Sequence, residues 1–244
     1  SLIEYSPGTG WIPLVDEYIT GQPSTCVCNF PTTATALYQF NDNVNDTCGN
    51  YNGIASNLNP YVTGKFGKAA SFNGTNSNVE FSAGAFTNTT MSFSAWIYST
   101  SNASDQNIFC NFDYISSVSK GFIFRKNAGS GNGALEIQLY DNSGSQNATI
   151  TTETVTNNTW THVVLTIDTT GASIYINNGT PKSLSASNPM AFHTATTRAG
   201  IGSYRYTASS FQGFFDGYID QARVFDTVLT PSQITELYNE VVCN

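Results

Sequence analysis

The chain has 244 residues and a formal net charge of −8, and only 11% of its residues are charged. Its nine Lys and Arg residues are scattered, whereas binding to nucleic acid requires clustered basic side chains that displace counterions. No apolar run approaches the roughly 20 residues that span a bilayer. These properties argue against nucleic acid as a partner and against membrane insertion.

Residues 1–33 predict an extended N-terminal arm. Two short extended pieces flank Pro7-Gly8, and Pro13 and Pro23 further disfavour a central strand. The apolar side chains of the arm have to be buried, and these are Leu2, Ile3, Trp11, Ile12 and Leu14. They can fold back onto their own domain or dock on a neighbouring subunit. We favour the neighbouring subunit, which predicts self-association, and head-to-tail addition of identical chains yields a filament.

From Ala34 onward, short strand-like runs alternate with turn-forming clusters. Gly, Asn and Ser gather between the runs, as in residues 127–133 and 142–144. Asn178-Gly179 is typical of a type I′ hairpin turn, whose two central residues need positive φ. Aromatic residues make up 13% of the chain, as strands prefer. We therefore predict one all-β domain over residues 34–244, built as a two-sheet antiparallel sandwich.

The spacing of apolar residues changes near the C-terminus from a strand-like to a helical pattern. Residues 213–225 alternate like a strand, with Phe215, Gly217, Ile219, Gln221 and Arg223 on one side and Tyr218, Asp220, Ala222 and Val224 on the other. Thr230, Pro231 and Gln233 then form a capping box with proline at the first helical position. A helical spacing follows at Ile234, Leu237, Tyr238 and Val241. This pattern predicts a closing strand followed by a short C-terminal helix.

Further motifs precede this strand and helix in a fixed order. They are Ala36–Phe40, Asp46–Gly53, Gly64–Gly74, the Trp-bearing runs Ser92–Ile97 and Trp160–Val164, and Ile174–Gly179. In this order they resemble LamG-like jelly-roll domains of the concanavalin A-like lectin and glucanase superfamily. The resemblance implies a two-sheet antiparallel jelly roll with a short C-terminal helix. The arm resembles hairpins of phage tail-fibre and virion proteins.

The resemblance implies a calcium site. Many members of this fold bind Ca²⁺ through carboxylates, amide oxygens and backbone carbonyls. The implied ligands are Asp46, Asn73, Gly74 and Asp220. Two other roles remain open: Asp46 can form a turn, and Asp220 can pair with Arg223 or cap a neighbouring amide.

The acidic residues do not match a glycoside hydrolase. Laminarinase-type relatives place their catalytic acids in a Glu-x-Asp-x-x-Glu pattern, which this sequence lacks. The nearest pair is Asp216 and Asp220, whose backbones would lie about 13 Å apart on a strand. Paired glycosidase carboxyls lie about 5 to 10 Å apart. His162 falls at the family's structural histidine, and His193 stands alone. We therefore predict that the domain is not an enzyme.

A glycan-binding site is an alternative to a purely structural role. Lectin-like sites stack sugars on exposed aromatic rings and bind their hydroxyl groups through amides and carboxylates. The candidates for such a rim are Tyr204, Tyr206, Phe211 and Phe214. Aromatic residues of a sandwich are more often buried in its core, and alternation does not tell which face is exposed.

The cysteines suggest one disulfide. In jelly rolls of this family the first and last strands pair, so the resemblance implies a bridge from Cys26 or Cys28 to Cys243. The cysteines can instead be free thiols, especially Cys110 in its apolar run. A disulfide favours an extracellular, cell-surface or virion-surface location.

Together these features predict a non-catalytic structural or adhesive module, stabilised by calcium, that assembles through its arm. A lectin-like carbohydrate-binding domain, a phage virion or tail-fibre protein and a degenerate glycoside hydrolase are the alternatives.

Overall fold

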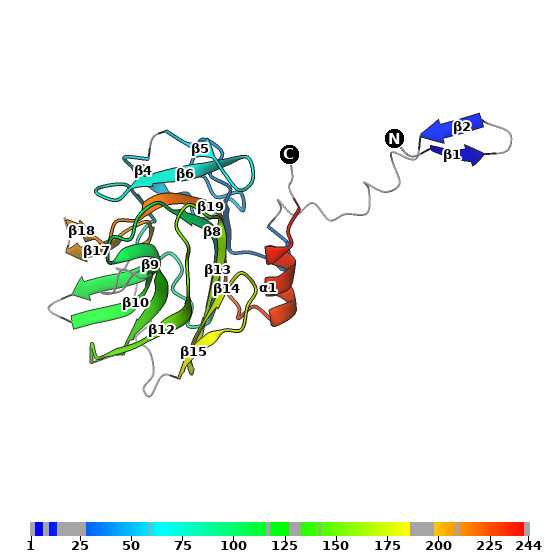
Figure 1. The fold of residues 1–244 in the computed structure, drawn as a ribbon. Helices are drawn as coiled ribbons and strands as arrows, with labels where there is room; N and C mark the ends of the chain where they lie inside the picture. The colour runs from blue at the N-terminus through cyan, green and yellow to red at the C-terminus, as the bar shows by residue number, and fades with distance from the viewer. Residues whose placement is uncertain are drawn as a thin grey trace.

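The computed structural model describes residues 28–58, 60–115, 118–126, 133–141, 143–185, 198–207 and 210–241, and the backbone of residues 3–6 and 10–13. Two large antiparallel sheets pack face to face as a sandwich (Figure 1). One short helix lies against the outside of the sandwich. The predicted all-β jelly-roll architecture with a C-terminal helix is confirmed.

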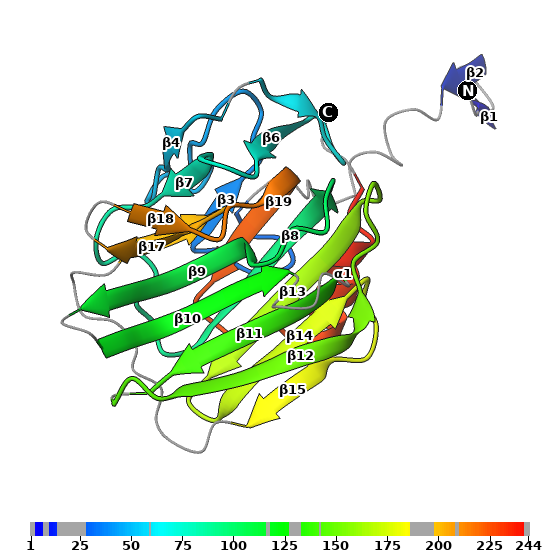
Figure 2. The same cartoon turned by 60° about the vertical axis from the view of Figure 1, so that its left-hand side comes forward.

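The first large sheet has the strand order β12-β11-β10-β9-β16-β7-β4. In chain order its strands are β4 (Ile54–Ser56), β7 (Asn78–Glu80), β9 (Gln106–Ile115), β10 (Val118–Lys126), β11 (Ala134–Tyr140), β12 (Gln146–Thr154) and β16 (Arg198–Ile201). Strands β9 to β12 form a meander, which Figure 2 shows from the front. The late strand β16 inserts between β7 and β9, so segments far apart in the sequence share this sheet.

The second large sheet has the order β15-β14-β13-β8-β19-β6-β5, and β3 also pairs with β19. Its strands are β3 (Ala36–Tyr38), β5 (Val62–Thr63), β6 (Lys68–Asn73), β8 (Met91–Ser99), β13 (Thr161–Asp168), β14 (Gly171–Ile176), β15 (Lys182–Ser185) and β19 (Asp216–Phe225). The first and last strands of the domain thus lie side by side.

The core fills the space between the two sheets. Phe93 on β8 and Phe109 on β9 stack with their ring centroids 4.4 Å apart and their planes 7° apart. Both side chains are fully buried, and burial of each removes an apolar surface worth about 1.5–3 kcal/mol. This stack joins the central strands of opposite sheets.

Strand β19 departs from the predicted alternation. Gln221 has a φ of +48°, and the pairing of β19 with β8 shifts register between Asp220 and Arg223. Such a bulge adds a residue to one strand and resets the faces beyond it. Ile219 and Ala222 therefore both join the core, although the sequence placed them on opposite faces.

Helix α1 (Pro231–Tyr238) begins with the predicted capping box. The Thr230 side chain accepts a hydrogen bond from the Gln233 amide, and the Gln233 side chain accepts one from the Thr230 amide. Ile234 and Leu237 are buried against Val164 of β13, on the outer face of the second sheet. The prediction was wrong for Val241, which follows the end of the helix and is 66% exposed. Among the described residues, no helix has the length and apolar character needed to cross a membrane.

The hairpin between β14 and β15 uses a different turn centre from the predicted one. Gly179 donates its amide to the Ile176 carbonyl, and the two residues between them, Asn177 and Asn178, have φ of +48° and +59°. The type I′ pair is thus Asn177-Asn178, one residue earlier than Asn178-Gly179. Asparagine tolerates positive φ well enough to replace glycine there.

The two extended pieces of the arm form their own hairpin. Strand β1 (Ile3–Ser6) pairs with β2 (Gly10–Pro13), with Ile3 opposite Pro13. Leu2 and Leu14 lie outside the described residues, as do the side chains of Ile3, Trp11 and Ile12. Where the arm docks therefore remains a prediction. Phe30, which lies in the predicted arm, packs against the buried residues under the helix, which include Ile234 and Leu237.

Candidate functional site

A short hairpin lies across the outer face of the first sheet, on the side away from the core. It consists of β17 (Tyr204–Thr207) and β18 (Ser210–Gln212), and it lies against β9 (Figure 2). The hydroxyl of Tyr204 donates to Oε1 of Gln212, its cross-strand partner, at 3.1 Å. Burial raises the pKa of Tyr204, which keeps this hydroxyl protonated and able to donate.

Gly213 holds the hairpin close to the sheet. Its φ is +66°, and an added Cβ would lie 2.7 Å from the Tyr204 ring and 2.8 Å from the Asp105 carbonyl oxygen. Its own carbonyl accepts a hydrogen bond of 2.7 Å from the Asn107 amide. A side chain at this position would force the hairpin away from β9.

Aromatic rings connect the hairpin to β9. Tyr204 meets Phe112 edge to face at a centroid distance of 5.6 Å, and Tyr206 stacks on Tyr114 at 5.2 Å with the planes 9° apart. Phe112 also contacts Tyr140 of β11 at 5.3 Å. Tyr206 is 37% exposed, and it is the only aromatic residue among the large exposed apolar side chains of the described chain. The stack therefore orients one tyrosine ring at the surface.

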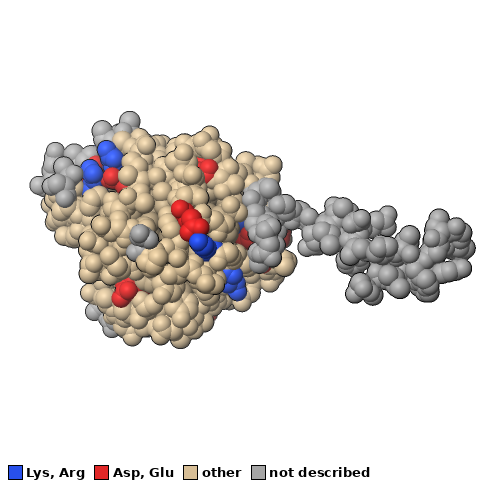
Figure 3. All heavy atoms as spheres, turned by 90° about the horizontal axis from the view of Figure 1, so that it is seen from above, with Lys and Arg blue, Asp and Glu red and all other residues tan. Residues whose placement is uncertain are grey.

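Charged side chains also connect the hairpin to neighbouring strands of the first sheet. Oε1 of Glu80 on β7 lies 2.9 Å from Nε of Arg205 in an ion pair, and Oε2 of Glu80 lies 3.4 Å from Nη1 of Arg198. The Arg205 guanidinium lies 5.5 Å from the centre of the Phe211 ring, within range of a cation–π interaction. Charged side chains are sparse on the face of the molecule seen in Figure 3. These contacts tie the hairpin to β7 and β16.

The structure brings together three of the four aromatic residues predicted for a glycan site. Tyr204, Tyr206 and Phe211 share the hairpin, whereas Phe214 is half-buried in the link between β18 and β19. Tyr114, which supports Tyr206, was not among the residues predicted from the sequence. Its alternation with Phe112 on β9 is visible in the sequence, but nothing there indicates that this face meets the hairpin.

Of the predicted calcium ligands, Asp46 is buried and organises the loop that follows β3. Its Oδ1 accepts the amides of Leu37 and Cys48 at 2.8 and 2.9 Å, and its Oδ2 accepts those of Asn50 and Tyr51 at 3.0 Å each. A carboxylate offers about four acceptor positions, so these four bonds occupy its capacity. Asp46 thus acts as the turn former that the sequence left open as an alternative.

Asp220 caps neighbouring amides. Its Oδ2 accepts a hydrogen bond from the Phe66 amide at 2.8 Å, and its Oδ1 accepts one from the Gln221 amide at 2.7 Å. Asp220 does not pair with Arg223, because Arg223 pairs with Glu240. Burial, which exceeds the opposing effect of these bonds, raises the pKa of Asp220 to about 7.

The remaining two predicted ligands belong to one turn. Oδ1 of Asn73 accepts bonds from residues 75–77, and Gly74, with φ of +70°, donates its amide to the Phe215 carbonyl. No group of three or more His, Cys, Asp or Glu side chains converges in the described part of the chain. The calcium site remains a prediction.

Ser94 and His162 lie within hydrogen-bond distance, as a catalytic serine and its general base do. Ser94 Oγ lies 2.8 Å from Nε2 of His162, but both side chains are buried, and the His162 ring packs against Trp96 and Tyr238. Burial, together with the charges of Arg223 and Lys65, lowers the pKa of His162 to about 3. A pair that no substrate can reach has a structural role. His193 lies outside the described residues.

Within the described residues, one disulfide joins Cys28 to Cys48, with an S–S distance of 2.13 Å. The predicted bridge from Cys28 to Cys243 was therefore wrong, while Cys26 and Cys243 lie outside the described residues. The loop after β3 folds back, as the Thr47 amide donates to the Leu37 carbonyl at 2.8 Å, and this brings Cys48 beside Cys28. Cys110 is a free, buried thiol, and burial raises its pKa to about 12.

One family model matches the part of the chain that forms most of the sandwich. The model of the concanavalin A-like lectin/glucanases superfamily matches residues 73–235, more than half of the chain. The chain belongs to this superfamily. A comparison with curated proteins gave no match.

Several solved structures that are similar to this chain are binding domains. Domain 4 of AbnA, a GH43 extracellular arabinanase from Geobacillus stearothermophilus, solved in complex with arabinotriose, is 24% identical with a TM-score of 0.68; the match covers 84% of this chain and 98% of that domain. The binding domain of Paraclostridial Mosquitocidal Protein 1 is 17% identical with a TM-score of 0.60, and the match covers 84% of this chain and 51% of that one. The heptameric SAP-like pentraxin of Limulus polyphemus is 18% identical with a TM-score of 0.53, over 69% of this chain and 80% of that one. At these identities the likeness shows the fold alone.

Proposed function

We propose that this domain is a non-catalytic carbohydrate-binding module and that Tyr206 is its stacking platform. The observation that carries the proposal is the exposed Tyr206 ring held parallel to Tyr114. A ring already fixed by a stack loses little conformational freedom when a sugar lies on its open face, and such preorganisation favours binding.

Polar groups beside the ring suit a sugar's hydroxyl groups. Gln212 is exposed on the neighbouring strand, and its amide can donate while its Oε1 accepts Tyr204. Arg205 is partly exposed and already oriented by Glu80. An aromatic platform with a few oriented polar groups is a common composition for small-ligand sites.

The comparisons support a binding role without a catalytic one. The arabinanase domain was solved with a bound arabinose oligomer, and the mosquitocidal protein contributes a binding domain. We infer that this chain also binds oligosaccharides, with arabinotriose as the first ligand to test.

The test compares two tyrosine variants by calorimetry against arabinotriose and a panel of neutral oligosaccharides. Tyr206→Ala should weaken binding about tenfold, because loss of an aromatic contact costs about 0.5–1.5 kcal/mol beyond its area. Tyr218→Ala is the matched control, since Tyr218 stacks on Tyr98 at 5.3 Å on the second sheet. Equal affinities for both variants, or failure of the whole panel to bind, would contradict the proposal.

Self-assembly through the arm is a second candidate. Strands β1 and β2 pair with each other in a sheet of two strands, and such an isolated hairpin is only marginally stable in water. A partner surface on another subunit would stabilise it. Deletion of residues 1–25 should leave the domain folded and abolish polymers in electron micrographs. Persistent polymers without the arm, or a monomeric intact chain at high concentration, would exclude this role.

We further place the module outside the cell or on a particle surface. The Cys28–Cys48 disulfide supports this location, because disulfides persist mainly in oxidising compartments. Detection of the bridge by mass spectrometry of natively produced protein tests it, and a fully reduced natural chain would contradict it.

A further inference from the structure

The sandwich has an opening where the edges of its two sheets approach each other. Strand β12 ends the first sheet and β15 ends the second, and the two lie side by side (Figure 2). Between them is a cavity of about 160 Å³, which we call the edge cavity. Ile174 and Ile176 of β14 form its apolar floor, and Glu153, Thr180 and Lys182 line its rim.

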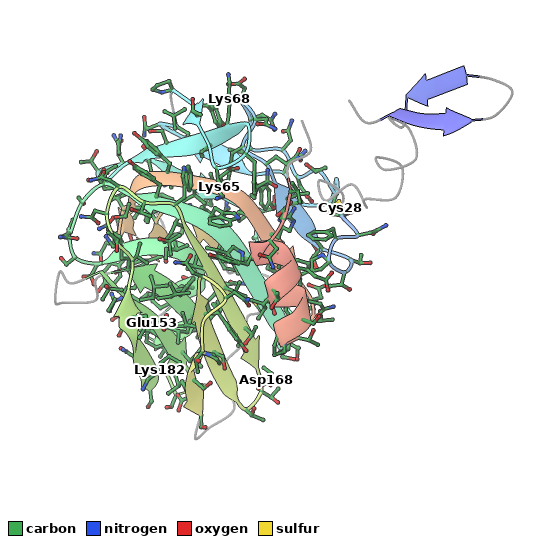
Figure 4. All side chains as sticks on the ribbon, turned by 45° about the vertical axis from the view of Figure 1, so that its right-hand side comes forward. Cys28, Lys65, Lys68, Glu153, Asp168 and Lys182 are labelled. Atoms are coloured by element: carbon green, nitrogen blue, oxygen red, sulfur yellow. A yellow bond between two sulfur atoms is a disulfide. The ribbon has the colours of Figure 1, made fainter. Side chains whose placement is uncertain are left out.

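The two charged residues of the rim come from opposite sheets. Lys182 pairs with Ile174 across the β14–β15 ladder, so its side chain starts from the same, inward face of the second sheet. Glu153 lies at the end of β12, and its carboxylate oxygens are 3.3 and 3.5 Å from the place where a Cβ on Gly179 would be. Figure 4 shows both side chains at the end of the sandwich opposite Lys68.

In the described part of the chain, the two opposite charges at this cavity, Glu153 and Lys182, do not form an ion pair with each other, although both line the same opening. Both charged side chains are exposed at the mouth of the cavity. Charges at sheet edges discourage pairing with other strands, which accounts for their presence but not for the space between them, whose lining is partly polar and partly apolar. That space is close in size to a cavity of about 150 Å³ that accommodates benzene.

We propose that the edge cavity binds a small zwitterion with an aliphatic side chain, the chemistry of a free amino acid such as leucine. The ammonium group would lie against the Glu153 carboxylate and the carboxylate group against the Lys182 ammonium. The aliphatic side chain would cover Ile174 and Ile176. This site is separate from the Tyr206 platform and does not depend on it.

The test follows leucine binding by NMR titration of the full chain. Leucine should saturate the amide shifts of β14 and β15 at millimolar concentration. Isoamylamine lacks the carboxylate, 4-methylpentanoate lacks the ammonium and glycine lacks the side chain, so each should bind about tenfold more weakly. Glu153→Gln and Lys182→Met should each weaken leucine binding to a similar degree.

Lys68→Met is the matched control, because Lys68 is an exposed lysine far from the cavity whose partner is Asp42. This variant should bind leucine as the natural chain does. Melting curves establish that each variant is folded before it is titrated. Absence of saturable shifts up to about 10 mM leucine, or equal binding by the rim variants, would overturn the proposal. Equal binding of isoamylamine, 4-methylpentanoate and leucine would also overturn it, since the charges would then contribute nothing.

Discussion

Arg223 of β19 forms a two-point ion pair with Glu240, two residues beyond the end of helix α1. Nη1 lies 2.8 Å from Oε2 and Nη2 lies 2.5 Å from Oε1, and the side chains are 1% and 2% exposed. The pair joins the outer face of the second sheet to the segment after the helix. It therefore fixes the helix on the sheet at the end that its capping box does not control.

Loss of Glu240 should destabilise the domain strongly. Glu240→Ala removes the carboxylate that compensates a buried guanidinium, and breaking a buried pair from one side costs about 3–5 kcal/mol. Asp42→Asn is the control, because it breaks the Lys68–Asp42 ion pair, whose side chains are 49% and 62% exposed, and asparagine tolerates the φ of +62° at this position. That change should cost about 1 kcal/mol or less. Urea unfolding of both variants measures the difference, and similar losses would contradict the assignment.

Asp220 should make the domain less stable as the pH rises from about 4 to 7. Its folded pKa of about 7 lies above the ordinary value of 3.8 for this carboxyl, so the folded state holds the proton more tightly in this range. The free energy of unfolding contributed by this group is greatest below the unfolded pKa and declines through the folded one. Asp220→Asn should flatten that part of the pH profile. A carboxyl that titrates near 4 in carbon-detected NMR would show the expectation to be wrong.

His162 should have the opposite effect. Its folded pKa of about 3 lies below the ordinary value of 6.5 for histidine, so between these values the unfolded state binds the additional proton. Stability from this group is complete above about pH 6.5 and is lost as the pH falls toward 3. His162→Gln should reduce acid sensitivity in denaturant titrations between pH 6.5 and 3. An unchanged slope in this variant would mean that His162 becomes protonated in the folded state.

Calcium should raise the melting temperature if Asp46 and Asp220 share an ion, because a ligand that binds only the folded state stabilises it. Excess chelator would then lower the melting temperature, and Asp46→Asn would remove the effect. The four amide bonds of Asp46 provide the competing arrangement. A melting curve unaffected by chelator, with no metal in elemental analysis, would exclude the site.

Local features of the sequence predicted the elements whose stabilising contacts are themselves local. The capping box of Thr230 and Gln233 lies within four residues, and it marks the helix start correctly. The predicted helical spacing correctly identified Ile234 and Leu237 as buried, but it extended too far at Val241. Spacing alone does not show where the sheet beneath the helix ends.

Features that depend on how the chain folds back on itself could not be predicted from the sequence. Cys28 had several partners open to it, and the return of the loop to β3 selected Cys48. The bulge at Gln221 reversed the expected faces of β19, because the pairing with β8 tolerates an extra residue there. Neither the bridge nor the bulge has a local sequence signal that separates it from its alternatives.

The candidate site divides in the same way. Periodicity and capping depend on neighbours along the chain, so they predicted the two-sheet sandwich and the helix, and the order of motifs predicted the jelly roll by resemblance. The contact of Tyr206 with Tyr114 at the surface, and the cavity shared by Glu153 and Lys182, became evident in the folded structure. Exposure and juxtaposition are properties of surfaces that meet across strands distant in sequence, and alternation along one strand does not determine which face another segment covers.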